Sequence, residues 1–369
     1  MSEGKITILV IDRSAVERDL LKSELGRYPD INVIGVAPNG NIGLIKTGDL
    51  RPDLVLLDAG VEDLSPVDFT VQSRKKISGL GIVLMTTENP SRQIIDRTVE
   101  SLEKGAFDFI EKPSFEDGPH RSEVMIRKLL PKIRGYSIKR YTRLAKIATG
   151  KSSAAEPADP GAAPGARTGT VEAARHPRRN SFRLVAFGVS TGGPEAMGKI
   201  LSGFPSDFPL PIVMVMHMPK NFTASMAADL DRKSDIGVRE AADGDPLAPG
   251  TAYLARGGSH LRIVKGEGDS FLLRLDEGPP VKGCRPSVDI LFKSVAECAG
   301  SHAIAIILTG MGDDGVEGMI ALKKKGAITI AQDQDSSVVW GMPGESVKAG
   351  AIDEVVALDR IAERVMELI

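Results

Sequence analysis

The C-terminal half carries residue types that could hydrolyse an ester or amide bond. Ser190 lies in GVSTG (188–192), a G-x-S-x-G pattern whose glycines permit the tight strand-to-helix turn that exposes a nucleophilic hydroxyl. A serine hydroxyl needs a base, usually histidine, and the histidine needs a carboxylate to orient it. His217 ends an apolar run, and Asp313 and Asp314 share a glycine-rich loop after another run. These positions predict a nucleophile, a base and an orienting acid.

Other functions fit parts of the same pattern. A glycine-rich turn at a helix start also binds phosphate groups, so a nucleotide-binding domain is an alternative. The turn lacks both the G-x-G-x-x-G order and the Gly-Lys-Ser/Thr of a P-loop, which favours the hydrolase. Two adjacent aspartates could form a turn or a cation site, but the loop offers no further oxygen ligands.

The N-terminal half has a second set of chemically capable residues. Asp12, Asp58, Thr86 and Lys112 each follow or end an apolar run, and the carboxyl ends of parallel strands converge on one crevice. Carboxylate oxygens bind Mg²⁺, while a hydroxyl and an ammonium can contact phosphate oxygens. The set predicts a site for a hard cation and a phosphoryl group.

Both sets require parallel sheets to position them. In the first ~120 residues, short apolar runs alternate with amphipathic stretches, which is typical of a (βα)5 unit. The predicted strands are 6–12, 31–37, 54–58, 81–87 and 107–113, with helices at 15–28 and 91–106.

The second half repeats this alternation. Apolar runs without polar alternation indicate strands covered on both faces, hence a mainly parallel sheet. The predicted strands are 182–189, 211–217, 251–255, 303–310 and 327–333, with an antiparallel hairpin of 260–264 and 271–275 added to the sheet.

Length and composition limit the remaining choices. A chain of 369 residues predicts two domains, which we place at 1–135 and 182–369. Between them we expect a basic helix at 137–148 and a flexible linker to residue 181, because this segment is rich in Ala, Pro, Gly and Ser. The net charge of −2 gives no field that would attract nucleic acid.

Two cysteines, Cys284 and Cys298, are too few for a disulfide framework and lack metal-ligand spacing, so we expect buried free thiols. No window approaches ~20 uninterrupted apolar residues, so we expect no membrane insertion. These features predict a cytoplasmic protein.

Residues 5–125 resemble the receiver domain of two-component response regulators. The resemblance implies that Asp58 is the phosphoacceptor, that Asp12 and Asp58 bind Mg²⁺, and that a histidine kinase is the phosphodonor. It matches Thr86 and Phe109 to the switch pair and Lys112 to the phosphate-contacting lysine.

One position departs from the receiver pattern. Receivers carry two adjacent acidic residues after the first strand, whereas this chain has Asp12-Arg13. A guanidinium cannot coordinate Mg²⁺ and repels it, so we expect weakened metal binding. The hypothesis is a degenerate receiver that is phosphorylated poorly or serves as a docking module.

Residues 182–369 resemble the catalytic domain of the bacterial chemotaxis protein-glutamate methylesterases, the CheB family. Five separated motifs carry the resemblance, namely GVSTGGPEAM, HMPKNFTASMAADL, RPSVDILF, ILTGMGDDGVEGM and WGMPGESVKAG. It implies a doubly wound sheet, with Ser190 as nucleophile, His217 as base and Asp314 as orienting acid. Thr191 and the backbone N–H of Met311 match oxyanion positions. Arg285 is expected either to bind an acidic stretch of substrate or to form a structural salt bridge.

The resulting prediction is a two-domain α/β hydrolase that cleaves glutamyl methyl esters on methyl-accepting chemoreceptors. The resemblance also implies glutamine deamidation, no cofactor for catalysis, and a receiver-like domain that covers the active-site cleft until it is phosphorylated. A non-catalytic signalling module that only docks receptors is a further alternative.

Overall fold

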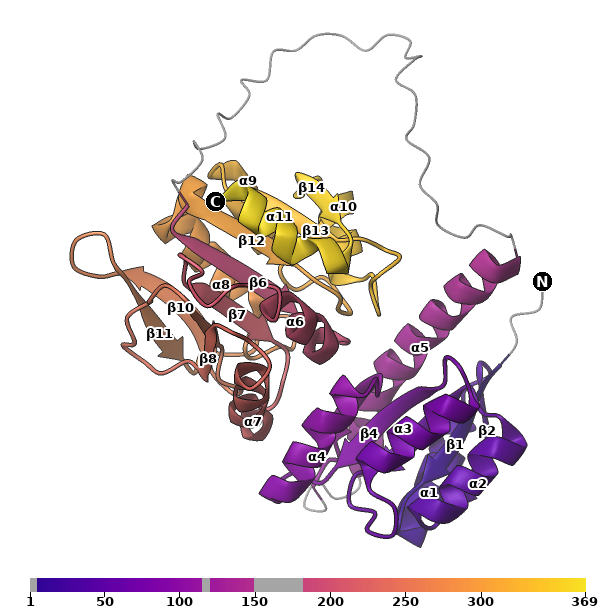
Figure 1. Cartoon of the computed structure of the whole chain (residues 1–369). Coiled ribbons are helices and arrows are strands. Elements are labelled where there is room, and N and C mark those ends of the chain that lie inside the picture. The colour runs from indigo at the N-terminus through magenta and orange to yellow at the C-terminus, as the bar shows by residue number, and fades with distance from the viewer. Residues whose placement is uncertain (1–4, 115–119, 149–181) are drawn as a thin grey trace, which may run out of the picture.

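The computed structural model describes residues 5–114, 120–148 and 182–369. Two α/β lobes lie against each other, one from each half of the chain (Figure 1). The predicted linker to residue 181 lies outside the described residues from 149 onward.

The N-terminal lobe is a parallel five-stranded sheet with the order β2-β1-β3-β4-β5. β3 and β4 are buried along their whole length, which explains their uninterrupted apolar sequences. This is the predicted (βα)5 arrangement. Its elements are β1 (Ile6–Ile11), α1 (Ala15–Leu25), β2 (Ile31–Ala37), α2 (Gly40–Leu50), β3 (Leu54–Asp58), α3 (Pro66–Lys76), β4 (Gly81–Thr86), α4 (Arg92–Glu103), β5 (Asp108–Glu111) and α5 (Arg121–Ala148).

The last helix of this lobe is longer than the sequence pattern indicated. α5 runs from Arg121 to Ala148, so the basic stretch 137–148 is its C-terminal part and not a separate helix. The apolar residues Met125, Leu129 and Ile133 recur every four positions and are fully buried. The boundary expected at residue 135 therefore falls inside one helix.

The C-terminal lobe is a parallel seven-stranded sheet with the order β14-β13-β12-β6-β7-β9-β8. The short edge strands β8 and β14 were missed in the sequence because neither has the length of an apolar run. The elements are β6 (Leu184–Val189), α6 (Gly193–Leu201), β7 (Ile212–Met216), α7 (Lys220–Asp231), β8 (Gly237–Glu240), β9 (Thr251–Leu254), β10 (His260–Lys265), β11 (Phe271–Asp276), α8 (Val288–Cys298), β12 (Ala303–Ile307), α9 (Val316–Lys324), β13 (Ile328–Gln332), α10 (Met342–Lys348), β14 (Glu354–Val356) and α11 (Ile361–Leu368).

The order in which the chain adds strands to this parallel sheet reverses beside the central strand β6. From β6 the chain builds one side through β7, β8 and β9, and it then returns to add β12, β13 and β14 on the other. α8, α9 and α10 contact one another or the strands on one face, whereas α6, α7 and α11 form the other layer. The hairpin β10-β11 is a separate two-stranded sheet that packs on α8, so the expectation that it extends the large sheet is wrong.

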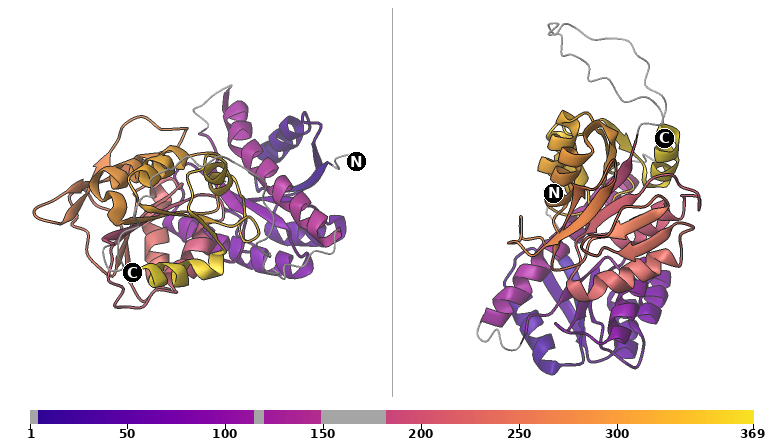
Figure 2. Two further views of the ribbon diagram at one scale, coloured as in Figure 1. Left: turned by 90° about the horizontal axis from the view of Figure 1, so that it is seen from above. Right: turned by 90° about the vertical axis from the view of Figure 1, so that its left-hand side faces the viewer.

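The two lobes meet through α4 of the receiver-like lobe, which packs on α6 and α7 (Figures 1 and 2). At the centre of this contact the Phe109 ring lies against the Phe222 ring, with centroids 4.5 Å apart. Around it, Glu103 pairs with Lys233, and the Ser225 hydroxyl donates to Asp96. An apolar centre with a polar rim is the usual composition of a specific interface.

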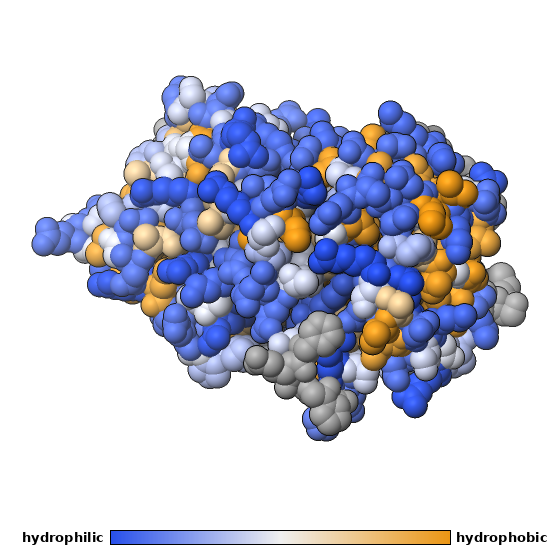
Figure 3. Space-filling model, turned by 90° about the horizontal axis from the view of Figure 1, so that it is seen from below, coloured by the Kyte–Doolittle hydropathy of each residue, from blue (hydrophilic) through white to orange (hydrophobic). Residues whose placement is uncertain are grey.

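Seen from below, the surface is mostly hydrophilic, with hydrophobic side chains on both lobes (Figure 3). The exposed apolar residues of the receiver-like lobe include Ile42 and Ile45 of α2. Among the residues that the structure describes, no helix combines the length and apolar character needed to cross a bilayer.

Candidate active site

Three loops at the carboxyl edge of the large sheet bring the candidate catalytic residues together. Ser190 follows β6, His217 follows β7 and Asp314 follows β12, and β6 lies between the other two strands. The gap between β6 and β12 is the point where the strand order reverses. Ligand sites in doubly wound sheets form at this crevice.

The turn after β6 holds Ser190 at the edge of the sheet. Its N–H donates to the carbonyl of Thr309 at 3.0 Å, and its carbonyl accepts from the Gly193 N–H at 2.8 Å. Gly192 has φ +82°, and a Cβ there would lie 2.6 Å from Val338, so the turn requires glycine. α6 begins at the next residue.

His217 and Asp314 form a direct pair. The Nε2 atom of His217 lies 2.7 Å from Oδ2 of Asp314, and the two side chains are 14% and 3% exposed. Asp314 also accepts from the Ser287 hydroxyl at 2.7 Å and from the backbone N–H groups of Val288 and Asp289 at 2.8 and 3.1 Å. Asp314 therefore stays fixed at the start of α8 and orients the imidazole.

The pair changes the protonation of both groups. Burial alone would lower the pKa of His217, but the hydrogen bond to Asp314 and the neighbouring Cys284 raise that pKa to about 9. Burial likewise opposes ionisation of Asp314, yet the bond to His217 leaves the pKa of this carboxyl below its ordinary value. Asp314 is ionised at neutral pH and stabilises a charged imidazole.

The serine and the histidine share one cleft. Ser190 and His217 both line it, but within residues 5–114, 120–148 and 182–369 no hydrogen bond joins the serine hydroxyl to the imidazole. Serine–base hydrogen bonds are often long before substrate binds. The structure thus brings together the His217–Asp314 half of the predicted triad and positions Ser190 beside it.

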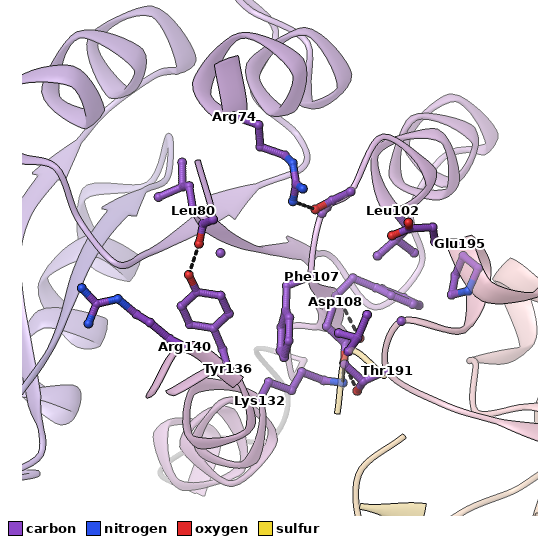
Figure 4. A pocket seen from close by; sticks show the side chains of 18 of the residues that line it. Arg74, Leu80, Leu102, Phe107, Asp108, Lys132, Tyr136, Arg140, Thr191 and Glu195 are labelled. Carbon is purple, nitrogen blue, oxygen red and sulfur yellow. Dashed lines mark hydrogen bonds and ion pairs between the residues drawn. The ribbon is translucent and has the colours of Figure 1, made fainter. Parts of the chain in front are cut away.

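This cleft, of about 450 Å³, lies between the lobes. Figure 4 shows side chains of both lobes around it, with Asp108 of β5 pointing toward Thr191. The Thr191 hydroxyl donates to Oδ2 of Asp108 at 2.5 Å, and Lys132 of α5 reaches the same oxygen at 2.6 Å. A carboxylate of the receiver-like lobe thus accepts the hydrogen bond of the hydroxyl that was predicted to stabilise an oxyanion.

The other two residues predicted to contact substrate are Met311 and Arg285, and the structure gives them different surroundings. Among the described residues none accepts a hydrogen bond from the Met311 N–H, which is consistent with an oxyanion donor. The Arg285 guanidinium donates to the carbonyls of Glu277 and Gly278 at 2.9 and 3.0 Å and forms no salt bridge among the described residues. Its expected contact with an acidic stretch of substrate stays a prediction. Asp313 pairs with Lys282 at 3.1 Å, which explains a second aspartate in this loop.

Two further residues near the site carried no usable sequence signal. Cys284 and Cys298 are both only partly buried, contrary to expectation, and the Sγ of Cys284 lies 3.7 Å from Nδ1 of His217. His260 has a structural role, since one ring nitrogen accepts from the Ser287 N–H and the other bonds the Pro279 carbonyl.

At the carboxyl edge of the first sheet, the predicted phosphorylation residues also converge. Lys112 Nζ lies 2.5 Å from Asp12 and 3.0 Å from Asp58, and all three are buried. Burial would lower the pKa of Lys112, but the two carboxylates raise it, so the lysine is charged. Arg13 adds a second cation, with Nε 3.5 Å from Asp58 Oδ2.

This arrangement does not fit a resident Mg²⁺. Two carboxylates face two cationic side chains, so the cluster has no excess negative charge to attract a divalent cation. Arg13 also occupies the position from which receivers provide a second acidic ligand. The residues present hold Asp58 in an ion-paired network.

The predicted switch pair lies between this cluster and the interface. The Thr86 hydroxyl is buried and donates to the Ile110 carbonyl at 3.4 Å. Phe109, on the adjacent strand β5, points into the lobe contact and packs on Phe222. The first lobe thus connects its Asp58 site to the covered cleft through β4 and β5.

Fold and site define a class: a serine-hydrolase domain whose cleft is covered by a receiver-like domain. The chain matches the family described as CheB methylesterase over residues 185–365 and the response regulator receiver domain over residues 8–119.

Full-length relatives are similar to the whole chain. Proteins named protein-glutamate methylesterase/protein-glutamine glutaminase from Xanthomonas campestris and Syntrophus aciditrophicus are 37% and 38% identical, each over 99% of this chain and over 98% and 100% of their own length. The solved CheB methylesterase catalytic domain of Thermotoga maritima is 40% identical, covers 51% of this chain and 99% of its own, and has a TM-score of 0.50. This chain belongs to the CheB methylesterase family.

Proposed function

We infer that this protein is a protein-glutamate methylesterase that hydrolyses glutamyl methyl esters on other proteins and releases methanol. The observation that carries the inference is the 2.7 Å pair of His217 and Asp314 beside the Ser190 turn, at the switch point of the sheet. The full-length relatives carry the name of this activity and of glutamine deamidation. Neither a nucleotide-binding nor a non-catalytic domain is favoured by any of these observations.

In the proposed mechanism, the Ser190 hydroxyl attacks the ester carbonyl while Nδ1 of His217 takes its proton. Asp314, bonded to Nε2, stabilises the imidazolium. The carbonyl oxygen becomes an oxyanion, for which the Thr191 hydroxyl and the Met311 N–H are the proposed donors. The imidazolium then protonates the leaving methoxide, and methanol departs from an acyl-enzyme.

Water completes the cycle. His217 removes a proton from the water as it attacks the acyl-enzyme, and then returns a proton to Ser190. The products are a glutamate carboxylate and free enzyme. The same steps on a glutamine side chain would release ammonia, so deamidation requires no additional group.

The proposed substrates are methyl-accepting chemoreceptors, and the proposed phosphodonor is a histidine kinase. Receiver and methylesterase domains in one chain support a role in two-component chemotaxis. The receptor segments that this substrate implies lie in the cytoplasm, so the proposal requires a cytoplasmic enzyme. We propose no cofactor for catalysis, because the residues named above account for every proton transfer.

We further propose that the receiver-like lobe inhibits the esterase by covering its cleft. Asp108 holds Thr191, and Phe109 packs on α7 next to it in the interface. Phosphorylation of Asp58 would relieve this contact, but the Arg13 and Lys112 pairs make Mg²⁺-dependent phosphorylation inefficient.

The test is methanol release from a methylated receptor with the full chain and with residues 182–369. The proposal expects release by both proteins, a faster rate for the isolated domain, and none with Ser190→Ala. No release by either protein would refute the esterase, and equal rates would refute inhibition by the first lobe.

A further inference from the structure

Cys284 lies beside the ring nitrogen of His217 that accepts the serine proton in the proposed mechanism. It belongs to the loop before α8, and its Sγ is 3.7 Å from Nδ1 of His217. The thiol is partly exposed and forms no disulfide. The other cysteine, Cys298, ends α8 and its thiol contacts the Ile263 carbonyl instead.

The histidine ring is oriented so that Nδ1 is available to a ligand. Because Nε2 bonds Asp314, the tautomer with a proton on Nε2 leaves the Nδ1 lone pair directed toward Cys284. Histidines that bind metals almost always donate their other ring N–H to a carboxylate, a backbone carbonyl or water, and here the acceptor is a carboxylate. The carboxylate, the imidazole and the thiol therefore stand in the order of a carboxylate–histidine–metal–thiolate site.

Asp314 is suited to the outer position of such a site. Its two oxygens already accept hydrogen bonds from His217, Ser287, Val288 and Asp289. If an Asp314 oxygen bound the metal directly, it would lose hydrogen bonds that hold the start of α8. The two inner ligands are therefore Nδ1 of His217 and Sγ of Cys284, within a group of three residues whose potential ligand atoms all lie within 4.8 Å of one another.

The separation of the two inner ligands suits zinc. Tetrahedral bonds of ~2.05 Å to nitrogen and ~2.3 Å to sulfur place the two donor atoms about 3.6 Å apart. The observed distance is 3.7 Å. A cation could enter between the two atoms with little rearrangement of the loop.

We propose that His217 and Cys284 form a binding site for Zn²⁺ that reversibly inhibits the esterase. Nitrogen and sulfur donors select Zn²⁺ over Mg²⁺ or Ca²⁺, which prefer oxygen. On binding, Nδ1 of His217 and the thiol each release a proton to solvent, and nitrogen–zinc and thiolate–zinc bonds form with no change of oxidation state. The zinc takes the lone pair that must accept the Ser190 proton, and water or the Ser190 hydroxyl completes its coordination.

The inhibitory effect rests on the proposed function, whereas binding itself can be measured without substrate. Co²⁺ is the probe, because a cobalt–thiolate bond produces a charge-transfer absorption band. We expect reduced, chelator-treated full-length protein to develop the band at one equivalent of Co²⁺, and Zn²⁺ to abolish it. Cys284→Ala and Cys284→Ser should lack the band, while the matched control Cys298→Ala should keep it.

The second measurement is methanol release during titration with Zn²⁺. We expect Zn²⁺ to inhibit the wild type and Cys298→Ala at concentrations at least about tenfold lower than it inhibits the two Cys284 variants, and a chelator to restore activity. Equal inhibition of all variants, or a thiolate band that survives in both Cys284 variants, would overturn the proposal. If metal-free wild type releases no methanol, the esterase proposal fails, and the cobalt band still decides the metal site.

Discussion

Two parallel sheets in this chain gather charged side chains at their carboxyl edges. The two clusters differ in which of their polar groups remain available for chemistry. In the catalytic lobe, one carboxylate holds one imidazole, and the second ring nitrogen faces outward. In the receiver-like lobe, Asp12 and Asp58 are matched by Lys112 and Arg13. The same strand-edge geometry thus yields a reactive site where one ring nitrogen remains available for proton transfer and a closed one where every carboxylate has a cation.

The strongest test of the open site is to remove its nucleophile. Ser190→Ala should lower methanol release on the order of 10⁴-fold or more, because the loss of a triad serine removes the covalent pathway. The thermal midpoint should change little, since the backbone contacts of Ser190, and not its hydroxyl, hold the turn. A variant that keeps its rate would show that the reactive group lies elsewhere.

The pH profile tests whether His217 is the base. The pKa of about 9 means that the ring is mostly protonated at neutral pH, and only the neutral ring can accept a proton. The rate should therefore rise about fiftyfold from pH 7 to pH 9. Methanol release in the presence of a chelator measures this profile.

Cys284→Ala provides the internal comparison for that profile. Cys284 contributes to the raised pKa of His217, so its removal should move the rise in rate to lower pH. A profile that is flat across this range in the wild type would exclude His217 as the group that limits the rate.

The closed site can be tested by restoring the acidic residue that receivers carry. Arg13→Asp removes the guanidinium beside Asp58 and adds a carboxylate, so Mg²⁺ binding should strengthen. We expect Mg²⁺-dependent incorporation of phosphate from acetyl phosphate to increase on the order of tenfold. Asp58→Asn in the same background should abolish it. Strong Asp58-dependent labelling of the unmodified chain would contradict the closed cluster.

The sequence predicted most of the elements that carry these two clusters. Buried parallel strands produce uninterrupted apolar runs, so β6, β7 and β12 were identified correctly. The short strands β8 and β14 were not, because three or four half-exposed residues carry no periodic signal. The extent of α5 was underestimated because the pattern does not reveal that one helix continues past the sheet it covers.

Contacts between distant loops were the part that the sequence could not specify. Cys284 was interpreted as a buried thiol, since no spacing relates it to His217, and only folding brings them within 3.7 Å. No role was predicted for Asp108, because a single aspartate in a strand belongs to no motif. Its role depends on how the two lobes pack against each other, and no short sequence pattern predicts that packing.

Asp108 therefore gives the smallest and most specific test of how the two regions are coupled. Asp108→Asn keeps the size of the side chain but weakens the charge-assisted hydrogen bonds to Thr191 and Lys132. A loss of about 1 kcal/mol from the closed arrangement would raise the open population, and the rate of methanol release, about fivefold. Asp96→Asn is the matched control, because Asp96 contacts Ser225 across the same interface without reaching the cleft. A larger gain from Asp108→Asn than from Asp96→Asn would locate the inhibition at Thr191. Equal gains would instead assign it to the interface as a whole, and the closed lobe would then act by covering the cleft and not by holding a reactive group.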